Sequence, residues 1–332
     1  MNTNLSHRLK LIRKLRGMSM DMLVSRIGGI VSKMAISKYE RGVMYPSGEV
    51  LFKIANACGV TVDFFNHPHV DIGKISYRFF EDHPAEVASL LTTQIQELLD
   101  QYIAVEDMTK TEVAFSNPLK DFIVNEFCDV ESAVTVLRSE WQLGIQPIVS
   151  VYETLQLHGV RVVEFYYEDS ELNGLSTYVN GIVPFVLINT FSNKTVERKR
   201  FTALHELGHL LLNNSIKKSN TDYDNMIENI VNRFAGAMLL SGEGAFNRIG
   251  KKREDITLKE LISIKNLYGI SISALNYRLY ALDIISYEYR NHIFNDVINS
   301  NVMEKGWGGF PIPEVADRLS LIEERIKINS CL

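Results

Sequence analysis

The chain has 332 residues, 46% of them hydrophobic and 23% charged, and a net charge of −5. This composition is ordinary for a soluble protein with a sizeable core, and the length predicts about two or three domains. No apolar run approaches membrane-spanning length, the first residues are too polar for a signal peptide, and three distant cysteines exclude a disulfide framework. We therefore expect a cytoplasmic protein with no membrane partner.

The charge is unevenly distributed. Residues 1–66 contain ten Lys or Arg and four Asp or Glu, so this stretch carries +6 and the remainder carries −11. A basic N-terminal module on an acidic body indicates a polyanionic partner for that module alone.

Apolar spacing, serine caps and glycines predict five short helices in this module. The first helix ends at Gly17, and a tight turn at 28–31 separates the second from the third. Five such helices describe a helix-turn-helix domain, which we expect at residues 1–67. The other helices are predicted at Met20–Ile27, Ser32–Glu40, Gly48–Cys58 and Thr61–Phe65.

The stretch SKMAISKYERGVMYPSGEVLFKIANACGVTVDFF, from Ser32 to Phe65, closely resembles the Xre/Cro-type helix-turn-helix repressors. The resemblance covers nearly all of residues 5–65 and implies a double-stranded DNA operator as the partner, with Ser32–Glu40 as the recognition helix. Arg13 and Glu40 match positions that pair and orient a phosphate contact in that family. The DNA-binding residues implied are Lys33, Met34, Ser37, Lys38, Arg13 and Arg41.

Two departures from the family pattern affect individual contacts. Met20 stands where a glutamine usually caps the second helix, and the turn that follows this helix is slightly longer. Lys33 and Lys38 can donate to guanine edges or to phosphates, and Ser37 permits close approach. The alternative is a small protein-interaction domain with a solvated basic face. Such modules usually bind two half-sites as dimers, so a homodimer is one option.

Residues 68–117 are predicted to form a linker with an amphipathic helix at Glu86–Asp107, whose apolar residues fall on one stripe. This helix could dimerise the protein or pack within its own chain. A coiled coil would need more heptads than are present.

The stretch Arg198–Asn213, RKRFTALHELGHLLLN, contains the His-Glu-x-x-His pattern of zinc peptidases. His205 and His209 project from one face of a helix, where they can bind one tetrahedral zinc ion with room for a third ligand and a water. Glu206 is placed to act as general base on that water. The alternative is a core helix that carries two satisfied histidines.

The third metal ligand is expected on the next predicted helix, Asp222–Leu240. Glu228 lies at the edge of its apolar stripe and could close a His-His-Glu site, and Asn232, one turn further on, could orient that carboxylate. Asp222 and Asp224 are rival ligands by proximity, and Glu228 could equally be an ordinary solvated acid.

The motif helix belongs to a body that we expect at residues 118–286, with earlier helices at Val130–Leu143 and about 146–158. Asn180-Gly181 between apolar runs is a strong hairpin signal, so we predict a small antiparallel sheet. In zinc peptidases of this general plan, an edge strand beside the site holds an extended substrate by main-chain pairing, which suits a protein substrate. The strands are predicted at Val160–Tyr167, Leu175–Val179 and Ile182–Asn189.

The pair FTALHELGHLLLN and ENIVNRFAGAMLL resembles the ImmA/IrrE family of metallopeptidases, which are similar to thermolysin-type enzymes. The resemblance spans roughly 118–286 and implies His205, His209 and Glu228 as ligands of Zn²⁺ (or Mn²⁺), with Glu206 as general base. Ser241 stands where the family often has proline, which affects only the helix end. Fusion to an Xre-type domain is known in this family, whose characterised members cleave, or promote cleavage of, helix-turn-helix repressors.

The sequence leaves the oxyanion-stabilising group open among Tyr178, Tyr223 and His292. Downstream, helices are predicted at Thr257–Tyr268 and Ser273–Leu282, and residues 287–332 form an extension with a final helix at Glu314–Ile328.

The sequence thus predicts a mostly helical α+β protein, in which a five-helix helix-turn-helix domain precedes a thermolysin-like metallopeptidase domain. Two functions fit this plan. One is a DNA-binding regulator that is also a zinc endopeptidase, acting on a repressor protein or on itself. The other is a non-catalytic regulator whose metallopeptidase-like body senses a ligand, a metal or a partner.

Overall fold

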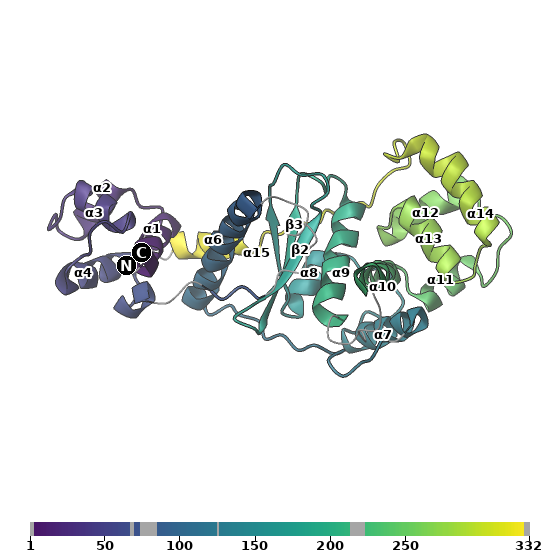
Figure 1. The fold of residues 1–332 in the computed structure, drawn as a ribbon, viewed down its shortest axis with the longest axis horizontal. Coiled ribbons are helices and arrows are strands. Elements are labelled where there is room, and N and C mark those ends of the chain that lie inside the picture. Colours follow the sequence, from purple (N-terminus) through teal and green to yellow (C-terminus); the bar gives the residue numbers. More distant parts are fainter. Residues whose placement is uncertain (1–2, 67–69, 74–84, 125, 213–222, 329–332) are drawn as a thin grey trace. The chain divides into compact units, whose positions relative to one another are not determined.

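The computed structural model describes residues 3–66, 70–73, 85–124, 126–212 and 223–328 (Figure 1). The chain divides into two compact units, each built from separate stretches of sequence. The first contains residues 1–71, 83–112 and 317–332, and the second contains residues 72–82 and 113–316.

The first unit begins with the predicted helix-turn-helix fold, and each predicted helix is present. Ser19, Ser32 and Ser47 cap three of these helices, because each side chain accepts a hydrogen bond from a backbone N–H in the first helical turn. The core contains Leu9, Ile12, Leu23, Ile36 and Phe65, all fully buried. The elements are α1 (Thr3–Leu15), α2 (Met20–Arg26), α3 (Lys33–Glu40), α4 (Gly48–Cys58) and the 3₁₀ helix η1 (Val62–Asn66).

Two more helices complete this unit. The long α6 (Ala85–Thr109) packs in cis on α1 and on α15 (Arg318–Ile328), with Val105 buried among Leu15, Ile322 and Ile326. An Arg16 Nη1 to Ile326 carbonyl hydrogen bond of 3.0 Å also fixes α15. The final helix is therefore part of the first unit.

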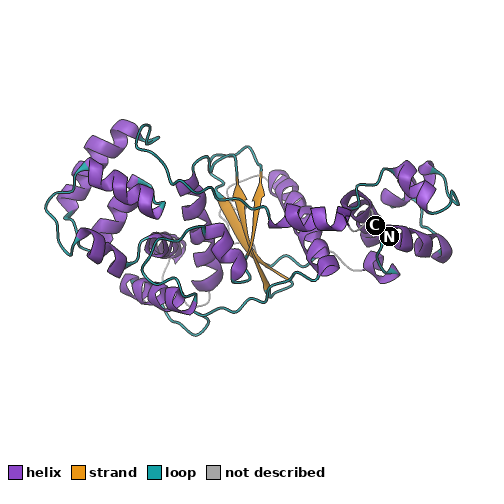
Figure 2. Cartoon of the chain, turned by 180° about the vertical axis from the view of Figure 1, so that it is seen from behind, coloured by secondary structure: helices purple, strands orange, loops and turns teal. Residues whose placement is uncertain are grey.

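The second unit contains the sheet, which is mixed rather than wholly antiparallel (Figure 2). The hairpin predicted at Asn180-Gly181 joins β2 (Gly174–Val179) to β3 (Val183–Asn189) in antiparallel pairing. However, β1 (Arg161–Phe165) pairs in parallel with β3, so the strand order is β1-β3-β2. The physical reason is that β3 is almost continuously apolar and buried, which places it in the centre.

The helices of the second unit surround the motif helix. α9 (Val196–Leu212) packs on β2 and β3 and also on α10 (Tyr223–Leu239), which in turn packs on α7 (Phe127–Glu140) (Figure 1). The mostly helical α+β prediction is thus confirmed. The further helices are α8 (Val151–Leu157), α11 (Gly242–Ile249), α12 (Leu258–Tyr268), α13 (Ile272–Ala281), α14 (Tyr287–His292), the π-helical η2 (Ile293–Ile298) and η3 (Asn299–Asn301).

Among the described residues, no helix combines the length and the apolar character needed to cross a membrane.

Candidate metal centre

The two motif histidines lie side by side on α9. Their Nε2 atoms are 3.2 Å apart, and the two rings meet edge to face. Leu204, Leu207 and Leu211 bury the remaining faces of the helix. Gly208, between the histidines, allows α10 to approach, since a Cβ there would come within 3.1 Å of both Val231 and Phe234. The motif therefore brings both imidazoles to the surface of α9 that faces α10.

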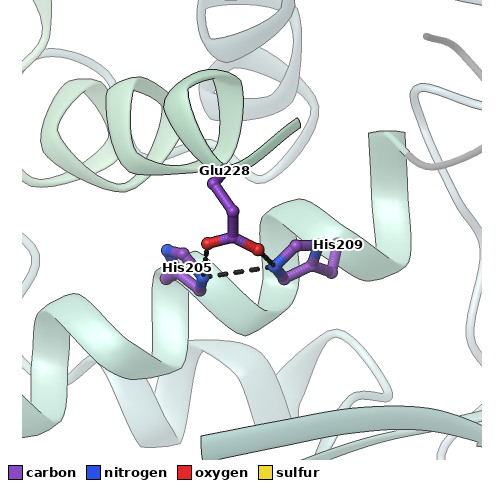
Figure 3. Close-up of side chains that lie close together, drawn as sticks. All are labelled: His205, His209 and Glu228. Atoms are coloured by element: carbon purple, nitrogen blue, oxygen red, sulfur yellow. Dashed lines mark hydrogen bonds and ion pairs between the residues drawn. The ribbon is translucent and has the colours of Figure 1, made fainter. Parts of the chain in front are cut away.

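Glu228 reaches this pair from α10 (Figure 3). Its Oε2 is 3.4 Å from His205 Nε2, and its Oε1 is 3.3 Å from His209 Nε2. All the prospective ligand atoms lie within 4.8 Å of one another. Two imidazole nitrogens and one carboxylate are a donor set that suits zinc in a catalytic site, where one position stays open.

The charges of these three residues are strongly coupled. Burial raises the pKa of Glu228, but hydrogen bonds from both histidines outweigh it and hold that pKa well below its usual range. Burial lowers the pKa of His205, but the hydrogen bond and charge of Glu228, with the charge of Glu206, leave it raised. The carboxylate thus remains ionised, and a divalent cation would replace a proton as its counter-charge.

Asn232 orients a histidine rather than the carboxylate. Its Oδ1 lies 3.0 Å from His205 Nδ1, so the protonated Nδ1 donates to it and Nε2 is left to bind a metal. The sequence analysis placed Asn232 behind Glu228, and the contact with His205 corrects this. The Nδ1 of His209 is buried and has no hydrogen-bond partner within the described part of the chain.

Glu206 faces the sheet. Its side chain is buried, and its Oε2 accepts a hydrogen bond of 2.8 Å from Ser176 Oγ on β2. Gly174 on the same strand leaves no space beside it, since a Cβ would come within 3.1 Å of Glu206 Cγ. The sequence analysis missed Ser176. Its signal was the period-2 alternation of β2, which directs residues 174, 176 and 178 to one face.

Buried ion pairs fix the N-terminal half of α9. Arg200 Nη1 donates to Glu314 Oε1 at 2.6 Å, and both side chains are fully buried. Glu314 also accepts from the backbone N–H groups of Val151 and Tyr152, which begin α8. Glu197 on α9 pairs with Lys265 and accepts from the Phe310 N–H. The stretch after η3 therefore holds the motif helix in place.

A cavity of about 630 Å³ borders the site. It lies between α9, α10 and α13, and its lining includes Phe201 and Arg198 from α9, Asn232 from α10 and Tyr277 from α13. Asn232, which contacts His205, is therefore shared between the wall of this cavity and the prospective metal site. Its mixed polar and aromatic lining is typical of a binding site.

The candidates for the oxyanion-stabilising group are occupied by other contacts where the structure describes them. Tyr178 donates its hydroxyl to the Leu210 carbonyl at 3.0 Å, and the exposed His292 pairs with Asp296. Asp222 and the side chains of Tyr223 and Asp224 lie outside the described residues.

The predicted DNA-binding residues lie in the first unit, where α3 exposes Lys38, Arg41 and Met34, the last with 67% of its surface accessible. Lys33 is also exposed and pairs with Asp21 at 2.6 Å, whereas Ser37 is half-buried. Arg13 is buried: its guanidinium donates twice to Glu40 and once to the Met18 carbonyl. Arg13 thus holds the end of α3 through three of its five N–H groups.

Two family models match the chain. Residues 9–65 match the family described as "Helix-turn-helix", and residues 155–280 match the peptidase family described as "IrrE N-terminal-like domain". No curated protein and no solved structure shows a significant match. The matched regions contain the two stretches that carry the sequence resemblances, so both resemblances are confirmed. All three prospective metal ligands lie inside the second region.

Proposed function

Because the chain joins an Xre-like helix-turn-helix domain to an ImmA/IrrE-like domain, we propose that it is a DNA-binding transcriptional regulator with a zinc-dependent endopeptidase activity. The proposal assigns DNA binding to residues 1–67 and the metal chemistry to residues 118–286. Its substrate is a repressor protein or this chain itself. The convergence of His205, His209 and Glu228 is the observation that carries the proposal.

The family implies a metal, and the donor set supports zinc, with manganese as the alternative. Bound by these three residues, zinc would polarise the scissile carbonyl and activate a water. Glu206 accepts the proton of the attacking water and passes it to the leaving amine. The hydrogen bond from Ser176 occupies Oε2 and leaves Oε1 to hold that proton.

The DNA-binding part of the proposal rests on α3. Lys33, Lys38 and Arg41 offer cationic donors on an exposed surface. Met34 and Ser37 share the exposed side of the helix, where they can contact bases. The buried Arg13–Glu40 pair sets the position of this helix rather than contacting DNA itself.

The proposal is tested by metal content and hydrolysis together. We expect one zinc per chain in the wild type, and loss of that zinc in Glu228→Gln. Glu140→Gln is the matched control, since Glu140 is an exposed carboxylate on α7 outside the site, and it should retain zinc. A wild-type chain that binds no divalent metal would refute the proposed chemistry.

Sensing is the second candidate, and the cavity lined by Asn232 favours it because its size and mixed lining suit a small ligand. Glu206→Gln separates the two functions, since it removes the base but none of the metal ligands. Loss of hydrolysis and of the regulatory response, with zinc and DNA binding retained, supports the peptidase. An unchanged response supports sensing.

A further inference from the structure

Strand β2 has one side that the sheet does not use. The order β1-β3-β2 places β2 at an edge, and β3 pairs with its inner side from Gly174 to Val179. An edge strand offers unpaired backbone groups to any extended segment of chain. Its outer side is therefore a site where a protein segment can add as a further strand.

This edge strand runs along the motif helix. One face of β2 turns to α9, where Gly174 abuts Glu206, Ser176 donates to Glu206 and Tyr178 donates to Leu210. A segment added to the outer side of β2 would thus lie along the strand that touches the general base.

Part of that outer side is already paired with the chain itself. Ile72 forms an antiparallel bridge with Val179. The Gly73 N–H donates to the Tyr178 carbonyl at 2.9 Å, and Thr177 Oγ1 donates to the Gly73 carbonyl at 3.1 Å. The fit at Gly73 is close, since a Cβ there would come within 2.9 Å of the Tyr178 carbonyl oxygen.

The residues just before this contact are held as well. Val70 is buried, its N–H donates to Asp100 Oδ1 and its carbonyl accepts from Gln96 Nε2, both on α6. The chain then passes from the first unit to the second between Asp71 and Ile72. We call residues 70–73 the strap. Its second half, Ile72 and Gly73, pairs with β2 within the second unit.

We propose that Ile72 and Gly73 act as a tethered competitor for the edge of β2, so that an extended protein segment pairs fully with this strand only when the strap has detached. The proposal rests on the proposed function and specifies its regulation.

Tethering explains how so small a contact can compete. Because the strap belongs to the same chain as β2, its effective concentration at the strand is about a millimolar. It therefore outcompetes a free peptide that binds weakly and is present below that concentration. The two hydrogen bonds between Gly73 and β2 would reduce the affinity for a free peptide by about fivefold or more.

The test uses variants of Gly73 in the full-length, zinc-loaded chain. Gly73→Ala inserts a Cβ against the Tyr178 carbonyl, and Gly73→Pro removes the N–H that donates to it. Gly48→Ala is the matched control, because Gly48 has open space around its Cβ position and no positive φ. All three are combined with Glu206→Gln, so that a bound segment is not cut, and folding is checked by circular dichroism.

The probe is fluorescein-labelled β-casein, an unfolded protein, and its Kd is measured by fluorescence anisotropy. We expect both Gly73 variants to bind it about five times more tightly than the chain that carries Glu206→Gln alone. Gly48→Ala should bind it as that reference chain does. Equal affinity in all variants, or no binding by any of them, overturns the proposal. Hydrolysis of the same casein by the chain with Glu206 intact is measured separately. If the chain does not hydrolyse casein but its Gly73 variants still bind casein more tightly, the peptidase function is refuted and the strap proposal stands.

Discussion

Each unit contains a buried arginine–glutamate pair that positions its functional helix, and the two pairs differ in how completely they are buried. In the first unit, Arg13 of α1 holds Glu40 at the end of α3, and their side chains are 10% and 4% exposed. In the second, Arg200 of α9 holds Glu314, and both side chains are 0% exposed. Removing one partner of a fully buried pair leaves the charge of the other partner away from water. The stability of the second unit should therefore depend more strongly on its pair than that of the first.

The largest loss of stability is expected for Glu314→Gln in the second unit. It removes the ion-pair partner of the buried Arg200 guanidinium, and it weakens the cap on α8. We expect a loss of about 3–5 kcal/mol in the free energy of unfolding of the second unit, measured by urea titration. The exposed Glu140→Gln should change it by less than about 0.5 kcal/mol. A small effect of Glu314→Gln would mean that water reaches Arg200.

Glu40→Gln is the counterpart in the first unit. Arg13 keeps its bond to the Met18 carbonyl and can reach some water, so the expected loss is about 1.5–3 kcal/mol. Urea titration followed at the helices of the first unit would measure it. DNA affinity should fall as well, because α3 loses its anchor. A loss as large as that of Glu314→Gln would remove the contrast between the units.

A third carboxylate, that of Glu131, should make the stability of the second unit depend on acid pH. Burial raises the pKa of Glu131, but Arg278 and Arg233 outweigh it and leave that pKa below 4.5. A carboxylate with a lowered folded-state pKa stabilises the fold above about pH 4.5, and this contribution is lost as the pH falls through the folded-state value. Thermal unfolding from pH 6 to pH 3 should show a decline in stability that is smaller in Glu131→Gln than in the wild type. A parallel decline in both proteins would assign it to other groups.

The smallest effect on stability is expected at the exposed face of α3. Lys33→Ala with Lys38→Ala removes solvated side chains, so unfolding should change by less than about 0.5 kcal/mol. DNA binding should nevertheless weaken, and the salt dependence of its affinity should become shallower by up to about two units of logarithmic slope. Lys251→Ala with Lys252→Ala in the second unit is the control. DNA binding that is insensitive to salt in the wild type would contradict the helix-turn-helix role.

Local patterns were sufficient for the elements that carry the chemistry. The spacing of His205 and His209 predicted two of the residues that the structure brings together, whereas the apolar stripe made Glu228 only one of the candidates for the third. Cap and glycine signals likewise predicted the helices of the first unit.

Contacts between distant segments were not predictable in this way. No local pattern links Arg200 to Glu314, Ser176 to Glu206 or Ile72 to Val179, because each pair forms only when the chain is packed. The parallel pairing of β1 has the same origin, since a strand's apolar residues do not specify which neighbour it joins. Asn232 was recognised as a helper, but its partner depended on a side-chain orientation that spacing does not define.

Glu314 has a practical consequence for anyone who dissects this protein. A fragment that stops near residue 286 would retain the complete His-Glu-x-x-His motif and Glu228, yet it would strand the Arg200 guanidinium in the interior. Such a fragment could misfold and be taken for a dead enzyme. Recombinant work on the second unit should therefore keep the chain at least through Ala316, and inactivity of anything shorter should be ascribed to truncation.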